Sequence, residues 1–159
     1  MAIAGHETVL LEEAVEALVS DPDGCYVDGT YGRGGHAAAI LQRLSPVGRL
    51  LVIDKDPSAI EHARQQLGRD ARVMIEQASF AEIGEITAAR QLTDKVNGVL
   101  LDLGVSSPQL AEPTRGFSFI QDVPLDMRMA STKSIIAAQW IAPVGAPELP
   151  TVFLAHGEA

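Results

Sequence analysis

Residues 26–37 read "YVDGTYGRGGHA", and this stretch predicts the architecture of the chain around it. It starts as a short apolar strand that ends on Asp28, passes through four glycines and continues into a helix. Glycine-rich turns between a strand and a helix let a ligand approach the backbone closely in α/β proteins. Gly32, Gly34 and Ala37 match the G-x-G-x-x-A spacing of dinucleotide-binding loops, and no Lys-Ser or Lys-Thr pair follows them, which excludes a P-loop.

Strands and helices alternate on both sides of this loop. The predicted strands are residues 25–30, 49–54, 71–77 and 96–105, and the predicted helices are residues 10–19, 35–44, 57–67 and 80–92. Strands that are apolar almost throughout are typical of parallel sheets buried on both faces. We therefore predict an α/β fold, with a parallel sheet covered by helices on both faces and the first strand in its interior.

The sequence changes character after Gly104. Residues 106–131 form a long proline-containing segment with no clear period, which predicts an irregular connection. Loops of this length are usually functional or disordered. Residues 134–142 and 151–159 then read as two short helical segments separated by a proline-containing break.

Composition narrows the class of function. The chain of 159 residues fits one domain, and it has no apolar run that approaches the ~20 residues of a membrane-spanning helix. A formal net charge of −9 counts against a protein that grips nucleic acid with its whole surface, although a local basic face is compatible with it. The N-terminus does not resemble a signal peptide, and the single cysteine, Cys25, reads as a buried structural thiol. We expect a cytoplasmic protein that does not bind membranes.

Carboxylates gather at the ends of the predicted strands. Asp28 ends the first strand, Asp54 and Asp56 follow the second, and Asp102 lies near the end of the fourth. In a parallel α/β sheet these ends converge, so the carboxylates would repel a pyrophosphate. They would favour S-adenosylmethionine, which has a sulfonium and an amino group but no phosphate. Two alternatives stay open: an NAD-dependent oxidoreductase domain, and ordinary strand-end or helix-capping aspartates around an empty turn.

Several longer blocks of the sequence resemble one known family. The blocks "HETVLLEEAV", "YVDGTYGRGGH", "DKDPSAI", "GVLLDLGVSSPQL", "RGFSF" and "PLDMRM" are similar to successive signatures of the ribosomal RNA small subunit methyltransferase H family, also called RsmH or MraW. The resemblance implies a Rossmann-like class I S-adenosylmethionine-dependent methyltransferase fold. It also implies methyl transfer to the N4 of a cytidine in 16S ribosomal RNA of the small ribosomal subunit.

The resemblance further implies a set of site residues, with S-adenosylmethionine as cofactor and no metal. We expect Asp54 to accept the two ribose hydroxyls, Phe80 to offer an apolar face to adenine, and Asp102 to be the catalytic acceptor for the target amine. Arg115 and Arg128 lie in the irregular segment and would either contact RNA phosphates or order that segment. The donor-binding positions carried over from the family are Gly34, Gly35, His36, Asp54, Phe80, Asp102 and Gln109.

Members of this family continue beyond the segment that this chain matches. We accordingly expect a sheet truncated after its fourth strand, with residues 1–130 as a partial donor-binding core and residues 131–159 as the start of an inserted helical domain for substrate recognition. The alternative to an active enzyme is a non-catalytic S-adenosylmethionine-binding remnant or interaction module. The strand around Val99–Leu101 would have an unpaired apolar edge, which predicts a homodimer through that edge or coverage by the segment that follows it.

Overall fold

The computed structural model describes residues 10–120, 122–130, 135–145 and 148–156. The chain divides into two compact units, Met1–Gly104 and Val105–Ala159, and each is described here by itself. No helix among the described residues is long and apolar enough to cross a membrane. The predicted boundary between residues 130 and 131 remains a prediction.

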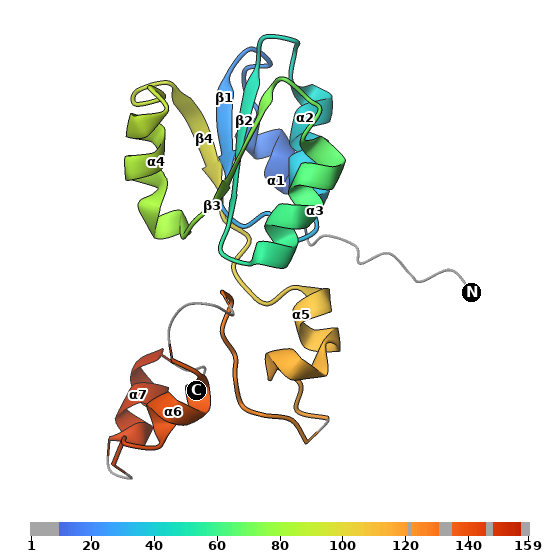
Figure 1. The fold of residues 1–159 in the computed structure, drawn as a ribbon. Helices are drawn as coiled ribbons and strands as arrows, with labels where there is room; N and C mark the ends of the chain where they lie inside the picture. Colours follow the sequence, from blue (N-terminus) through green and yellow to red (C-terminus); the bar gives the residue numbers. More distant parts are fainter. Residues whose placement is uncertain (1–9, 121, 131–134, 146–147, 157–159) are drawn as a thin grey trace, which may run out of the picture. The chain divides into compact units, whose positions relative to one another are not determined.

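The first unit contains a four-stranded, all-parallel sheet with the strand order β3-β2-β1-β4 (Figure 1). This order confirms the predicted parallel sheet and places the first strand between two neighbours. The pairings Asp28↔Val52 and Asp28↔Leu100 show that both neighbours extend to the last residue of that strand. The strands are β1 Cys25–Asp28, β2 Arg49–Asp54, β3 Val73–Gln77 and β4 Val96–Leu100.

Helices cover both faces of this sheet. Successive strand residues point to opposite faces, so each strand contributes side chains to both layers of packing. Tyr26 and Leu50 pack on the face with α1, α2 and α3, whereas Val27 and Leu51 pack on the face with α4 (Figure 1). This two-sided burial explains why the strands are apolar at almost every position. The helical elements of the first unit are α1 Leu11–Leu18, α2 Gly35–Arg43, α3 Pro57–Leu67, the 3₁₀ turn η1 Phe80–Glu82 and α4 Ile83–Ala89.

The start of α3 agrees with the sequence prediction to the residue. The Asp56 carboxylate accepts a hydrogen bond from the Ser58 backbone N–H at 2.9 Å, and Pro57 occupies the first helical position, where no N–H is needed. The next crossover differs from the prediction of one helix over residues 80–92. It begins with a 3₁₀ turn capped by Ser79, and α4 ends at Ala89 because Gln91 adopts a left-handed backbone conformation (φ 57°).

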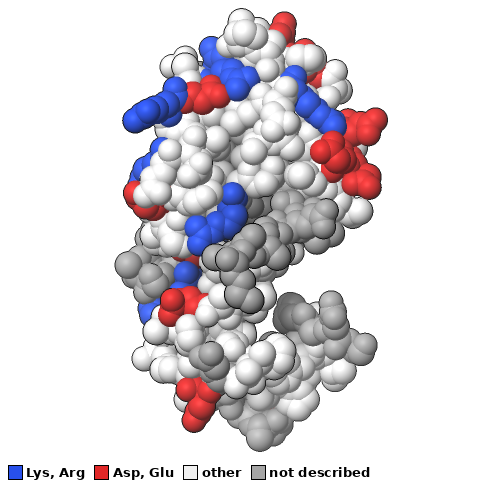
Figure 2. Space-filling model, turned by 90° about the vertical axis from the view of Figure 1, so that its right-hand side faces the viewer, with Lys and Arg blue, Asp and Glu red and all other residues white. Residues whose placement is uncertain are grey.

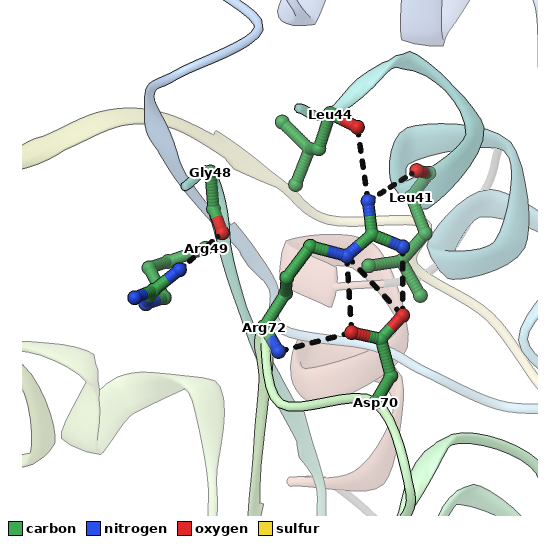
Figure 3. A network of polar contacts seen from close by, with 6 residues as sticks. All are labelled: Leu41, Leu44, Gly48, Arg49, Asp70 and Arg72. Carbon is green, nitrogen blue, oxygen red and sulfur yellow. Dashed lines mark hydrogen bonds and ion pairs between the residues drawn. The ribbon is translucent and has the colours of Figure 1, made fainter. Parts of the chain in front are cut away.

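An arginine closes the C-terminal end of α2 (Figure 3). The Arg72 Nη1 donates hydrogen bonds to the carbonyl oxygens of Leu41 (3.0 Å) and Leu44 (2.9 Å), which no longer have partners within the helix. The Asp70 carboxylate accepts hydrogen bonds from Nε and Nη2 of the same guanidinium, and these bonds lower the pKa of Asp70. Arg72 thereby ties the end of α2 to the turn before β3.

The fourth strand is shorter than predicted. β4 ends at Leu100 rather than at residue 105, because its pairing with β1 stops at Asp28↔Leu100 and the Gly29 N–H makes the last backbone bond, to the Leu100 carbonyl oxygen. Among the described residues β4 pairs only with β1, so it forms one edge of the sheet. The Val99 side chain on this edge is 44% exposed, as expected for an apolar strand without an outer neighbour.

The second unit contains a helix that the sequence prediction missed. Its helical elements are α5 Ser107–Ala111, the 3₁₀ turn η2 Pro113–Arg115, α6 Ala137–Ile141 and α7 Leu149–His156. The segment predicted to be irregular therefore begins with α5, whose five residues are too few to show a helical period. The last helix begins at Leu149, two residues before the predicted start at residue 151. Pro150 is compatible with this, because it lies in the first turn, where a missing N–H is tolerated.

Two arginines order the segment after η2. Arg115 Nη2 donates hydrogen bonds to the carbonyl oxygens of Arg128 (3.1 Å) and Met129 (2.9 Å). The Arg128 guanidinium in turn bonds to Asp126 and lowers the pKa of that carboxyl to about 2. These contacts give both arginines the loop-ordering role that the sequence left open beside RNA contact.

Candidate functional site

Three carboxylates lie at the carboxyl-terminal edge of the sheet. Asp28 is the last residue of β1, Asp54 is the last residue of β2, and Asp102 follows the end of β4 by two residues. The carboxylates of Asp54 and Asp102 both raise the pKa of Asp28, so the three groups are close enough to interact. The structure thus brings together three of the four acidic groups that the sequence predicted to converge, and the carboxylate of the fourth, Asp56, caps the start of α3.

Asp28 is the most buried of the three. Its side chain is 1% exposed, and its Oδ1 accepts a hydrogen bond from the Thr30 backbone N–H at 3.1 Å. Its Oδ2 has no hydrogen-bond partner among the described residues. Burial raises the pKa of Asp28 to about 7, and the bond from Thr30 only partly opposes this rise. Near neutral pH the group therefore exists in both its charged and its neutral form.

The glycine-rich loop, residues 29–34, is tied to the end of β4. The Gly29 N–H donates to the carbonyl oxygen of Leu100 at 3.0 Å, and the Thr30 hydroxyl accepts the N–H of Asp102 at 2.7 Å. Thr30 consequently connects two of the carboxylates, since its N–H binds the side chain of Asp28 and its hydroxyl fixes the backbone of Asp102.

The same loop is tied to the end of β2. The Tyr31 N–H donates to the carbonyl oxygen of Ile53 at 3.2 Å, and the Gly32 N–H donates to Asp54 Oδ2 at 2.8 Å. Asp54 Oδ1 accepts the N–H of Asp56 at 2.8 Å. Burial raises the pKa of Asp54 despite these bonds. Each carboxylate oxygen has a second lone pair, so Asp54 keeps the capacity to accept hydrogen bonds from a ligand.

Two glycines are required by the packing of this loop. Gly34 has a left-handed backbone (φ 81°), and a Cβ there would lie 2.6 Å from the Tyr31 hydroxyl oxygen. At Gly29 a Cβ would lie 2.6 Å from the Leu101 side chain and 3.2 Å from the Cβ of Phe80. The loop can therefore reach both α2 and the start of η1 only with glycine at these positions.

The predicted donor-binding residue His36 lies in the first turn of α2 and is buried. Its Nδ1 is 3.7 Å from Asp102 Oδ2, which is longer than a hydrogen bond and within the range of an ion pair when the imidazole is protonated. The N-terminus of α2 has no side-chain capping hydrogen bond, so His36 does not act as a helix cap.

The remaining predicted residues lie in different environments. Phe80 starts η1 on the first unit, is 38% exposed, and has the Lys55 Nζ 5.9 Å from its ring centroid. Gln109 is buried in α5 of the second unit, where its Oε1 accepts the Ser106 N–H at 2.9 Å. The structure thus brings Gly34, Gly35, His36, Asp54, Phe80 and Asp102 together on one unit, while the role of Gln109 in the site remains a prediction.

The charges at this edge suit a cationic ligand. Among the described residues no Lys or Arg forms an ion pair with Asp28 or Asp54. No group of three His, Cys, Asp or Glu in the described part of the chain could hold a metal ion. On the face drawn in Figure 2, Lys and Arg atoms occur in separate groups among acidic and uncharged atoms and do not merge into a continuous basic surface.

The sequence did not predict a contact between the glycine-rich loop and α3, which is made by two residues. Tyr31 is 4% exposed, and its hydroxyl lies 2.9 Å from the Nδ1 of His62 on α3. An aromatic residue between glycines was the only signal in the sequence, and nothing marked His62 as its partner.

One comparison bears on the family. A family model described as the MraW methylase family matches residues 3–159 of the chain. The match includes the loop, all three carboxylates and the whole second unit. It favours the methyltransferase interpretation of the loop over the dinucleotide-binding one.

Proposed function

The chain belongs to the MraW methylase family, and on that premise we propose that it binds S-adenosylmethionine at the carboxyl-terminal edge of its sheet. The observation that carries the proposal is the group of Asp28, Asp54 and Asp102, of which the first two have no Lys or Arg partner among the described residues. Such a group favours a ligand with positive charges and disfavours one with phosphates.

The residues present fit this donor chemically. S-adenosylmethionine, when bound, supplies a methyl group activated by a positively charged sulfur. Asp54 retains acceptor capacity for ribose hydroxyls, and Gly34 and Gly35 are donor-binding positions by family resemblance. Phe80 is half-exposed beside Gly29 and offers an apolar surface for adenine. Gln109 is a further donor-binding residue by family resemblance.

We also propose that the methyl acceptor is the N4 amine of a cytidine in 16S ribosomal RNA, as the family resemblance implies. This amine is a weak nucleophile because its lone pair is delocalised into the ring. An acceptor for its N–H and a fixed orientation would both raise its reactivity. Asp102 is suited to accept that proton, since its side chain is 51% exposed while its backbone N–H is fixed by Thr30.

A second candidate function is a donor-binding module without methyl transfer to RNA by this chain alone. The observations that favour it are the net charge of −9 and the separated Lys and Arg groups in Figure 2. Phosphate contacts need clustered cations. In this view residues 1–130 bind the donor, and the chain itself supplies no continuous cationic surface for RNA.

Two measurements test these proposals. Isothermal titration calorimetry with S-adenosylmethionine, S-adenosylhomocysteine and NAD should show binding of the first two and none of NAD; binding of NAD alone would overturn the donor assignment. Transfer of a labelled methyl group to small ribosomal subunits then separates the two candidate functions. Glu16→Gln is a matched control, because it removes one exposed carboxylate on α1 away from the site.

A further inference from the structure

We propose that His62 of α3, acting through Tyr31, is a positioning residue that holds the glycine-rich loop in its ligand-binding shape. The inference rests on the proposed function of that loop as the donor-binding element. It concerns a hydrogen bond between the loop and α3, and assigns to α3 a role in ligand affinity.

The geometry of the pair is specific. Tyr31 turns inward from the loop and belongs to the buried core on the α2 and α3 side of the sheet. Its hydroxyl oxygen lies 2.9 Å from His62 Nδ1, and the two rings are tilted by 44° with centroids 5.8 Å apart. The two residues are 31 positions apart in the sequence, so this contact joins the loop to a separate helix.

Both partners of this hydrogen bond are uncharged near pH 7. Burial, reinforced by the Asp28 carboxylate, raises the pKa of Tyr31 to about 12, so its hydroxyl keeps its proton. Partial burial, reinforced by the Arg33 guanidinium, lowers the pKa of His62, so its imidazole is neutral near pH 7. A neutral imidazole has one acceptor nitrogen. Tyr31 donates to His62 Nδ1 when the imidazole carries its proton on Nε2, and Nδ1 donates to the Tyr31 hydroxyl oxygen in the other tautomer, so one hydrogen bond joins the pair in either case.

The position of Tyr31 in the loop gives this bond its consequence. The preceding residue, Thr30, fixes the backbone of Asp102, and the following residue, Gly32, donates its N–H to Asp54. A displacement of Tyr31 would move the groups that orient both carboxylates. Loops that bind ligands are often among the least stable parts of a fold, so the loss of one partly buried hydrogen bond can lower the fraction of molecules whose loop has the binding conformation.

The Tyr31 ring also shapes the end of the loop. The Gly34 N–H donates to the Tyr31 carbonyl oxygen at 2.8 Å, and the missing side chain at Gly34 leaves room for the ring. A purely structural role would be packing of this ring in the core, and phenylalanine would satisfy that role equally well. The hydroxyl is needed only for the bond to His62.

The test uses variants that remove the bond and keep the packing. Tyr31→Phe deletes the hydroxyl, His62→Leu deletes the imidazole, and His62→Gln offers an amide in its place. Gln66→Leu, at an exposed position of the same helix, controls for placing leucine on α3. We expect Tyr31→Phe and His62→Leu each to weaken S-adenosylhomocysteine binding about fivefold, the double variant to weaken it no further, and His62→Gln to keep most of the affinity.

Hydrogen exchange gives a second readout that needs no ligand. The amides of Gly32 and Gly34 should exchange faster in Tyr31→Phe and His62→Leu than in wild type and in Gln66→Leu. Unchanged affinity and unchanged exchange in both variants would overturn the proposal and leave Tyr31 as core packing. Additive losses in the double variant would also overturn it, because the two residues would then act separately. If wild type binds neither S-adenosylmethionine nor S-adenosylhomocysteine, the proposed function fails, and hydrogen exchange alone decides the inference about the loop.

Discussion

Replacing Asp28 with asparagine should make the stability of the protein less sensitive to pH. Asparagine keeps the shape of the side chain and removes its charge. The carboxyl of Asp28 has an ordinary pKa of 3.8 and a pKa of about 7 in the fold, where it is fully buried. Because the folded chain binds this proton more tightly than the unfolded chain, ionisation destabilises the fold. The cost is absent below about pH 4, grows as pH rises, and is complete above about pH 7.

The magnitude follows from the two pKa values. A difference of about three units corresponds to about 4 kcal/mol of unfolding free energy, at 1.36 kcal/mol for each unit. Such a loss is large beside the 5–15 kcal/mol of a typical domain. Any effect of burying the asparagine amide is independent of pH, so it shifts the whole curve without changing its slope. The slope therefore isolates the contribution of the charge.

Urea denaturation followed by circular dichroism between pH 4.5 and 8.5 measures this effect. The unfolding free energy of wild type should fall relative to Asp28→Asn by about 3–4 kcal/mol across that range and then level off. Glu16→Gln should run parallel to wild type, since Glu16 is exposed. Parallel curves for wild type and Asp28→Asn would refute the reasoning, because Asp28 would then titrate as a hydrated carboxyl.

Four further predictions concern other parts of the molecule. Asp54→Ala should weaken S-adenosylhomocysteine binding by roughly 1.5–3 kcal/mol in calorimetry, because a charged acceptor for the ribose is lost; wild-type affinity in this variant would mean that the site is misplaced. Asp102→Asn should reduce methyl transfer to small ribosomal subunits more than it reduces donor binding, and equal losses would assign Asp102 to the donor alone. Arg72→Ala should lower the unfolding free energy by roughly 1–3 kcal/mol, since two carbonyl groups at the end of α2 lose their donor; a change below 0.5 kcal/mol in urea denaturation would show that water replaces the guanidinium at little cost. Light scattering should show a dimer that Val99→Lys dissociates, because Val99 lies on the exposed apolar edge of β4; a wild-type monomer would contradict this.

The sequence predicted the sheet well where local signals bounded each element. β2 is an apolar run between Arg49 and Asp54, and α3 begins with an Asp-Pro pair, so both elements agree with the prediction to the residue. The predicted end of β4, at residue 105, was wrong for a reason that lies outside the strand itself. Apolarity continues to Val105, but a strand needs a partner, and the length of β1 decides where that partner ends.

The prediction of the site was limited by tertiary burial. Convergence of Asp28, Asp54 and Asp102 follows from the rule that parallel strands end at one edge. The complete burial of Asp28 and the contact between Tyr31 and His62 depend on how α2 and α3 cover the loop, which no local pattern encodes. The start of the short helix α5 could have been predicted from the sequence, since Ser106 and Gln109 have the spacing of a capping box.

The hydrogen bonds of the loop imply that its three carboxylates respond to a ligand as a group. Thr30 joins Asp28 to Asp102, and Gly32 joins the loop to Asp54. Burial raises the pKa of Asp28 most, and repulsion by the other two carboxylates raises it further, so ionisation of Asp28 destabilises the fold. Asparagine at Asp28 would relieve that repulsion and keep the shape, so stability alone does not account for an acid there. Under the proposed function, a cation bound at this edge lowers the pKa of Asp28, so Asp28 releases a proton to solvent when the cation binds. S-adenosylmethionine, with its charged sulfur, should then bind with more proton release than S-adenosylhomocysteine, whose sulfur is neutral, and the affinity for the donor should gain more than the affinity for the product as pH rises through 7.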